Sequence, residues 1–291
     1  MSFTEFFYTN QEGMRLYARD YGDALAPGVP VLCLPGLTRN SKDFDKLAER
    51  LSAQHRVLCP DFRGRGRSDY CKSWTEYTPQ AEARDTFDLM AAAGVPHAAI
   101  ISTSRGGLVA TLMAAQRPGA LKGVVLNDVG PEVAQEGITR IMGYAGKMPA
   151  PESWDIAAIT LRQMNERHFP TITGPGWHEF AHMTFRDEDG KPALDYDSKI
   201  GDGLRIGMKL LRGKLPNMWT EFKALYTIPT LVLRGENSDL LSAETVKRME
   251  EVHPRLTAVT VPDRGHAPWL DEPQSLAAIG TFLEELDKQH A

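Results

Sequence analysis

The chain has 291 residues, of which 42% are hydrophobic and 24% charged, and its formal net charge is −5. This composition excludes an extensively disordered chain, and the mild negative charge gives no reason to expect nucleic acid as a partner. No apolar run approaches the length of a membrane span, and residues 1–7 lack the basic-then-apolar order of a signal peptide. We therefore expect a cytoplasmic protein that binds neither nucleic acid nor a membrane.

Up to residue 128, short apolar runs alternate with amphipathic helical patterns. The chain opens with a predicted β-hairpin, because two strand-like segments flank Gln11-Glu12-Gly13. The alternation predicts an α/β fold, with a mostly parallel sheet flanked by helices on both faces. The strands are predicted at residues 3–10, 14–21, 29–34, 55–60, 98–101 and 123–126, and two helices at about 79–93 and 106–116.

The alternation of apolar runs and helical patterns ends after Asp128. Residues 131–216 hold helical patterns, turns and several aromatic residues, but no clear buried strand. An irregular insertion between two regular blocks predicts a helical cap over 131–216, inserted into a core of residues 1–130 and 217–291. The later core elements are predicted as strands at 228–233 and 256–261, a helix at about 243–252, and a last helix with an apolar stripe between 276 and 286.

The three cysteines are Cys33, Cys59 and Cys71, and no pair has the CxxC spacing. Two of them lie in strongly apolar runs, which is typical of small buried side chains. The set favours neither a disulfide framework nor a zinc site.

The segment Ser102-Thr103-Ser104-Arg105-Gly106 joins a buried strand to a helix. It fits the nucleophile elbow, a tight strained turn that requires small residues two positions before and after the nucleophile. Ser102 and Gly106 fill those positions for Ser104. Ser102 fits worse as the nucleophile, because Ile100 would then occupy a position that needs a small side chain. Ser104 is therefore the predicted nucleophile, although a serine that only caps the helix is the simpler alternative.

A serine nucleophile needs a base and an acid that orients the base, and on this fold they follow it in the order acid, then His. His266 follows the strand at 256–261, and Asp239 follows the strand at 228–233. We predict these two as base and acid. Asp128 follows the strand at 123–126 and is the alternative acid, although a turn-forming role would also explain it.

The oxyanion formed at the substrate carbonyl needs two backbone donors. One is predicted to be the N–H of Arg105, the residue after the nucleophile. The other is predicted to be the N–H of Leu37, because the preceding Gly36 leaves the backbone free to turn its amide toward the site.

Four segments stand out: Leu34-Pro35-Gly36-Leu37, Asp61-Phe62-Arg63-Gly64-Arg65-Gly66-Arg67-Ser68, the elbow at Ser104, and Gly265-His266-Ala267-Pro268-Trp269. With them, the chain resembles the alpha/beta-hydrolase superfamily of serine esterases, lactonases and C–C hydrolases. Pro35 and Ser102 depart from its usual His and Gly, without removing a catalytic group. The resemblance implies a cofactor-free hydrolase that works through an acyl-enzyme. Relatives that are dehalogenases or epoxide hydrolases have Asp at the elbow, so Ser104 argues against both activities.

The predicted function is hydrolysis of a carboxylic ester or a related lactone or thioester. A C–C hydrolase or cofactor-free haloperoxidase is the alternative within the class, and a catalytically silent ligand-binding protein is the alternative outside it. The aromatic and methionine content of the cap suggests a small, largely apolar substrate. Trp177, Phe180 and Trp269 are the predicted pocket residues.

Two further motifs carry less weight. His178-Glu179-Phe180-Ala181-His182 matches the HExxH zinc motif, but no third ligand lies in a recognisable motif downstream. We expect an aromatic cap helix there, and neither a metal nor a cofactor in the reaction. The arginines at 63, 65 and 67 alternate with glycine and are flanked by acidic residues, which favours a structural turn near the site over nucleic-acid binding.

Overall fold

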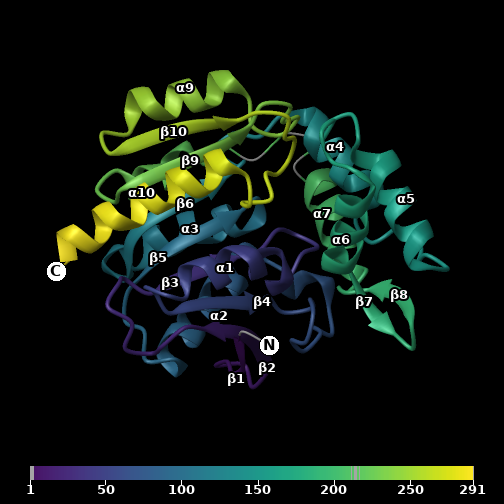
Figure 1. The fold of residues 1–291 in the computed structure, drawn as a ribbon, viewed down its shortest axis with the longest axis horizontal. Helices are drawn as coiled ribbons and strands as arrows, with labels where there is room; N and C mark the ends of the chain where they lie inside the picture. Colours follow the sequence, from purple (N-terminus) through teal and green to yellow (C-terminus); the bar gives the residue numbers. More distant parts are fainter. Residues whose placement is uncertain (1–2, 211, 213–214, 216, 291) are drawn as a thin grey trace.

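The computed structural model describes residues 3–210, 212, 215 and 217–290. Its central feature is an eight-stranded sheet with the strand order β1-β2-β4-β3-β5-β6-β9-β10 (Figure 1). The strands are β1 (Phe3–Thr9), β2 (Arg15–Tyr21), β3 (Val31–Leu34), β4 (Val57–Asp61), β5 (Ala98–Thr103), β6 (Leu121–Asn127), β9 (Thr230–Gly235) and β10 (Leu256–Val261).

Strands β3, β4, β5, β6, β9 and β10 pair in parallel. The hairpin β1-β2 adds an antiparallel edge, because β2 pairs antiparallel with β4. The predicted mostly parallel sheet is therefore confirmed. Parallel pairing gives all six strands the same direction, so the loops that follow them emerge at one end of the sheet.

Helices cover both faces of the sheet. The core helices are α1 (Asp45–Leu51), α2 (Pro79–Ala92), α3 (Arg105–Gln116), α8 (Trp219–Phe222), α9 (Ala243–Val252) and α10 (Pro273–His290), and the short 3-10 helices are η1 (Ser41–Phe44), η2 (Trp74–Glu76), η3 (Pro118–Ala120) and η4 (Lys223–Leu225).

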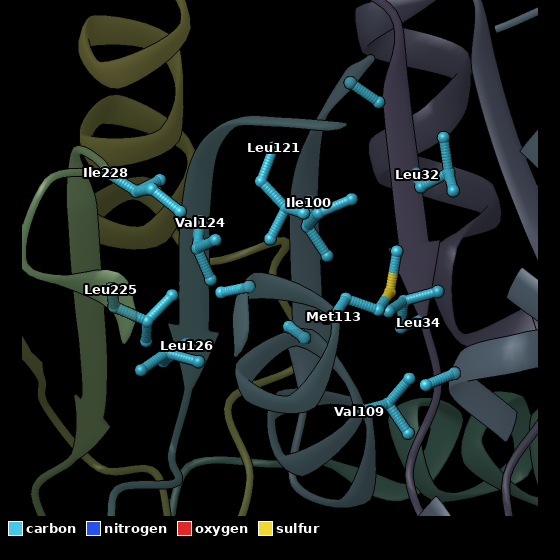
Figure 2. Packing of buried hydrophobic residues seen from close by; sticks show 14 of the residues in the cluster. Leu32, Leu34, Ile100, Val109, Met113, Leu121, Val124, Leu126, Leu225 and Ile228 are labelled. Carbon is cyan, nitrogen blue, oxygen red and sulfur yellow. The ribbon is translucent and has the colours of Figure 1, made fainter. Parts of the chain in front are cut away.

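The two sheet faces bury separate hydrophobic clusters. On one face, Leu32, Ile100 and Val124 pack against Val109 and Met113 of α3 (Figure 2). On the other face, the intervening residues of the same strands pack against α1 and α10. Because side chains alternate along a strand, a continuous apolar run is needed to serve both faces. The second cluster includes Val31, Cys33, Ile101, Val125, Leu47, Ile279 and Leu283.

Between β6 and β9 the chain leaves the sheet and forms a layer over one end of it, at the right of Figure 1. We use the name cap for residues 131–216; residue 216, its predicted end, lies outside the described residues, as do residues 1, 2 and 291, which belong to the predicted core segments. The cap elements are α4 (Gln135–Tyr144), α5 (Trp154–Asn165), α6 (Gly174–Thr184), β7 (Phe185–Glu188), β8 (Lys191–Leu194) and α7 (Lys199–Leu210).

The antiparallel pair β7-β8 was not predicted from the sequence. Its strands are only four residues long, and three of the four side chains of β7 are exposed, so neither strand has a long apolar pattern. Asp189 and Gly190 both have positive φ in the tight turn between them, and the Gly190 N–H donates to the Asp187 carboxylate at 2.9 Å. The acidic segment Asp187-Glu188-Asp189-Gly190 thus forms the end of β7 and the hairpin turn.

All three cysteines are buried and unpaired, as expected for small apolar side chains. Among the described residues, no helix combines the length and apolar character needed to cross a bilayer.

Candidate active site

Three polar side chains meet at the carboxyl end of the parallel strands. Ser104 follows β5, Asp128 follows β6, and His266 lies in the loop after β10. Strands β5 and β6 are neighbours in the sheet, so the residues that follow them are brought together by the sheet itself. His266 reaches the same place through a loop, which lies under the cap.

Ser104 occupies the strained turn that the sequence predicts. Its backbone has φ 51° and ψ −112°, in a region that residues with a side chain rarely adopt. Gly106 is required by packing, because a β-carbon at that position would lie 2.2 Å from the carbonyl oxygen of Leu34. The turn aims Ser104 at the cavity and places it at the start of α3, where the first N–H groups have no partner inside the helix.

Ser102 replaces the usual glycine of the elbow without strain. Its side chain is fully buried, and its hydroxyl donates to the carbonyl oxygen of Val125 at 2.7 Å. A buried hydroxyl needs such a partner, since leaving it unpaired costs about 1–3 kcal/mol.

His266 joins the other two residues. Its Nε2 lies 2.8 Å from Ser104 Oγ, and its Nδ1 lies 2.8 Å from Asp128 Oδ2. With Nδ1–H donating to the carboxylate, Nε2 is left free to accept the serine proton. The arrangement is the one that activates a serine hydroxyl as a nucleophile.

The carboxylate beside His266 is that of Asp128, and not that of Asp239 as the sequence analysis preferred. Asp128 is fully buried, and it also accepts hydrogen bonds from the Gly235 N–H at 2.8 Å and the Ser238 hydroxyl at 2.5 Å. Gly235 is the last residue of β9 and Ser238 lies in the loop that follows, so the end of this strand and its loop together support Asp128. They supply donors to the acid but not the acid itself.

Asp239 instead pairs with an arginine of the cap. Arg140 Nε and Nη2 donate to the two carboxylate oxygens at 2.6 and 2.8 Å. Burial by itself would raise the pKa of Asp239, but the hydrogen bonds and charge of Arg140 outweigh it and hold this pKa below its ordinary value. Both carboxylate oxygens of Asp239 thus accept a hydrogen bond from Arg140.

The two predicted oxyanion donors belong to backbone segments that share one buried network. Arg65 Nε donates to the carbonyl oxygen of Leu37 at 2.9 Å, and Arg65 also pairs with Glu82 at 3.0 Å. Glu82 in turn accepts from Arg105 Nε at 2.7 Å. Arg65 and Glu82 are both fully buried. One carboxylate therefore connects the residue after the nucleophile to the loop on the opposite side of the site.

The arginine run of the sequence is a buried structural turn. Arg63 pairs with Asp85 at 2.7 Å, and Arg65 belongs to the Glu82 network. Arg67 is half-exposed and pairs with Glu5. Two of the three guanidinium groups are thus inaccessible to a nucleic acid.

A cavity lies between the cap and two of the three polar residues, Ser104 and His266, whereas Asp128 is buried behind them. Phe180 and Trp269 line it, and their rings stack with centroids 5.1 Å apart. Trp177 does not line the cavity: it is 2% exposed and packs edge-on against Phe180 and Trp269 from behind. The sequence analysis placed Trp177 in the pocket with Phe180 because a helical pattern cannot distinguish a wall residue from the layer that supports it.

The HExxH histidines are engaged with other side chains. His178 lies 3.6 Å from Asp155, and His182 stacks on Trp154 with ring centroids 3.9 Å apart. The described residues contain no group of three side chains around them that could hold a metal ion.

Sequence reasoning did not single out four further residues of the site: Arg39, Arg140, Tyr144 and Ser238. Arg39, Arg140 and Tyr144 line the cavity, and Ser238 supports Asp128. No pattern in the sequence marks them, because each depends on a contact between segments that lie far apart in the chain. Ser238 could have been noted as the neighbour of Asp239, but its partner could not.

The fold and the site define a class: an open, mostly parallel α/β sheet that presents a Ser, His and Asp cluster at the carboxyl ends of its strands, beneath an inserted cap. Residues 31–279 match the model of the alpha/beta hydrolase family. The chain belongs to this family.

Two curated relatives match nearly the whole chain. The chain is 31% identical over 274 residues to the 3-hydroxybutyrate-oligomer hydrolase of Cupriavidus necator, with 92% of each chain covered. It is 26% identical over 260 residues to the 2-(acetamidomethylene)succinate hydrolase of Mesorhizobium japonicum, with 88% of each covered. Among solved structures, an alpha/beta hydrolase from Novosphingobium aromaticivorans superposes with a TM-score of 0.88 and 44% identity, covering 97% of this chain and 98% of the other.

Proposed function

We propose that the protein is a carboxylic ester hydrolase in which Ser104, His266 and Asp128 form the catalytic triad. The single observation that carries the proposal is the unbroken pair of 2.8 Å contacts from Ser104 through His266 to Asp128. The family supports a hydrolase, and the 3-hydroxybutyrate-oligomer hydrolase supports an ester as the bond that is cleaved. The cavity that opens onto Ser104 supports a small-molecule substrate.

In the proposed reaction, Ser104 Oγ attacks the ester carbonyl while its proton moves to Nε2 of His266. Asp128 holds the resulting imidazolium cation, and the carbonyl oxygen becomes an oxyanion facing the N–H groups of Arg105 and Leu37. When the intermediate collapses, the bond to the alcohol oxygen breaks and His266 returns the proton to that oxygen. Water then repeats the sequence on the acyl-serine, which releases the acid and restores Ser104.

The experiment that tests the proposal combines covalent labelling with turnover. A fluorophosphonate probe should label the wild-type protein on Ser104, and the protein should hydrolyse p-nitrophenyl esters of short acids. Ser104→Ala should lose labelling and reduce kcat by at least about 10⁴-fold, because its hydroxyl is the only nucleophile in the scheme. Ser102→Ala is the matched control, since that hydroxyl faces away from the cavity, and it should remain labelled.

Failure of the wild-type protein to label or to hydrolyse any ester would favour a catalytically silent binding protein on the same fold. Retention of most activity in a folded Ser104→Ala variant would remove Ser104 as the nucleophile.

A further inference from the structure

One wall of the cavity carries a guanidinium group that the proposed reaction does not use. Arg140 is on α4 and lines the cavity together with Tyr144, one turn further along the same helix. The wall around them is mostly apolar and includes Met148, Leu161 and Phe169. A charged group in such surroundings is costly to desolvate, so its position calls for an explanation beyond solubility.

Arg140 is held from behind. Its Nε and Nη2 use the carboxylate of Asp239, whose side chain is 4% exposed, whereas the Arg140 side chain is 23% exposed. Asp239 is not among the residues that line the cavity. Nη1 of Arg140 has no hydrogen-bond partner among the described residues. The pair therefore turns its cationic side, with two unused N–H donors, toward the space above Ser104.

The ion pair is not needed to fasten the cap to the core at this place. The start of α4 is already attached to the same loop through two backbone hydrogen bonds. These run from the Gly137 N–H to the Asp239 carbonyl at 2.9 Å and from the Ala134 N–H to the Leu240 carbonyl at 2.8 Å. A role in orienting Arg140 explains the pair better than a role as a latch.

A second guanidinium group, that of Arg39, also lines the cavity. Burial raises the pKa of the Tyr144 hydroxyl, while the positive charges of Arg140 and Arg39 act in the opposite direction, so this hydroxyl lies within the field of both guanidinium groups. Arg39 differs from Arg140 in the position of its partner. Its Nη2 lies 2.5 Å from Asp43 Oδ1, and Asp43 also lines the cavity. The charge of Arg39 is thus balanced within the cavity, and that of Arg140 is balanced from outside it.

We propose that Arg140, assisted by the Tyr144 hydroxyl, binds a carboxylate of the substrate, so that the preferred substrates are esters bearing a free carboxylate group. This inference rests on the proposed ester hydrolase function and names its substrate class. Planar guanidinium donors recognise carboxylates well, and a carboxylate in the cavity would restore the hydrogen bonds that Nη1 lacks. Asp239 acts here as a positioning residue.

The test compares two p-nitrophenyl esters that differ in charge. p-Nitrophenyl hemiglutarate carries a carboxylate at the end of its acyl chain, and p-nitrophenyl butyrate has a neutral chain. A parallel pair places the carboxylate on the alcohol side: 3-butyryloxybutyrate and its methyl ester.

For at least one pair, Arg140→Gln should lower kcat/KM on the anionic ester by about ten- to a hundredfold, with little change on the neutral ester. This is the loss expected when a hydrogen bond to a charged group is removed.

Arg162→Gln is the matched control, because Arg162 is also a cap arginine in an ion pair but is 61% exposed on α5. It should leave both rates unchanged. Arg140→Lys keeps the charge but not the paired donors, and it should retain part of the preference for the anionic ester. Equal losses on the anionic and neutral esters in folded Arg140→Gln, for both pairs, would overturn the inference and leave the ester hydrolase function standing.

If the wild-type protein hydrolyses none of these four esters, the proposed function fails first, and the binding site is tested without turnover. Glutarate should then raise the Tm of the wild-type protein and of Arg162→Gln but not that of Arg140→Gln. Absence of any shift in the wild-type protein would reject the carboxylate site as well.

Discussion

The floor and the roof of the cavity are built in different ways. On the floor, Ser104 and Asp128 follow adjacent strands directly, so the backbone of the sheet sets their positions. In the roof, cap helices position the side chains through ion pairs and ring contacts, such as Arg140 with Asp239 and Phe180 with Trp269. From this comparison we expect substitutions in the floor to change the reaction itself and substitutions in the roof to change which substrates are preferred.

The sharpest test of this comparison sets two aspartates against each other. Asp128→Asn should reduce kcat by about 10⁴-fold, because an amide beside Nδ1 favours the imidazole tautomer that cannot accept the serine proton. Asp239→Asn should reduce kcat by less than about tenfold on neutral esters, since it changes only the support of Arg140. Measurement of kcat for both folded variants decides the assignment, and the reverse ranking would return the acid to Asp239.

Disturbing the buried network behind the two proposed oxyanion donors should have the next largest effect on kcat. Glu82→Gln weakens the ion pairs that connect Arg65, which contacts the Leu37 carbonyl, to Arg105. We expect kcat to fall by about ten- to a hundredfold with a smaller change in KM, because the donors act mainly on the transition state. Asp88→Asn is the control on the same helix, since its hydrogen bonds to Gln11 are exposed. A change in KM alone would contradict a role in positioning the donors.

The Glu82→Gln variant also tests how the stability of the protein depends on pH. Burial by itself would raise the pKa of Glu82, but the charges of Arg105 and Arg65 outweigh it, and this pKa is lower in the folded protein than its ordinary value. A depressed folded-state pKa contributes stability that is present at neutral pH and is lost as the pH falls through it. The difference in unfolding free energy between wild type and Glu82→Gln should therefore shrink at acidic pH. Urea unfolding between about pH 7 and pH 3 checks it.

The smallest catalytic effects are expected in the roof, where two aromatic residues of α6 can be compared. Trp177→Ala removes a buried side chain and should destabilise the protein by about 3–5 kcal/mol without a large change in relative rates across an ester panel. Phe180→Ala removes a side chain from the cavity wall and so enlarges the cavity. It should shift relative rates between short and long acyl esters by several-fold, with less effect on Tm. The opposite assignment of the two effects would mean that Trp177 contacts the substrate.

The α/β fold could be predicted from the sequence, and so could the placement of Ser104 and His266 after strands of one sheet. Buried strands leave long apolar runs, and the elbow at Ser104 needs small residues at fixed spacing, so these features are local and visible in the chain. The hairpin β7-β8 lacked such a signal, because its strands are only four residues long and most of β7 is exposed.

Which aspartate contacts His266 could not be predicted from the sequence and depends on how the chain folds. Asp128 and Asp239 both follow strands of the same sheet, and the sequence order Ser, Asp, His is satisfied by either. The choice depends on how the loop after β9 turns: it directs the Ser238 hydroxyl to Asp128 and leaves Asp239 to Arg140 of the cap. Local spacing carries no information about such contacts, because each joins side chains about a hundred residues apart, and folding alone brings them together.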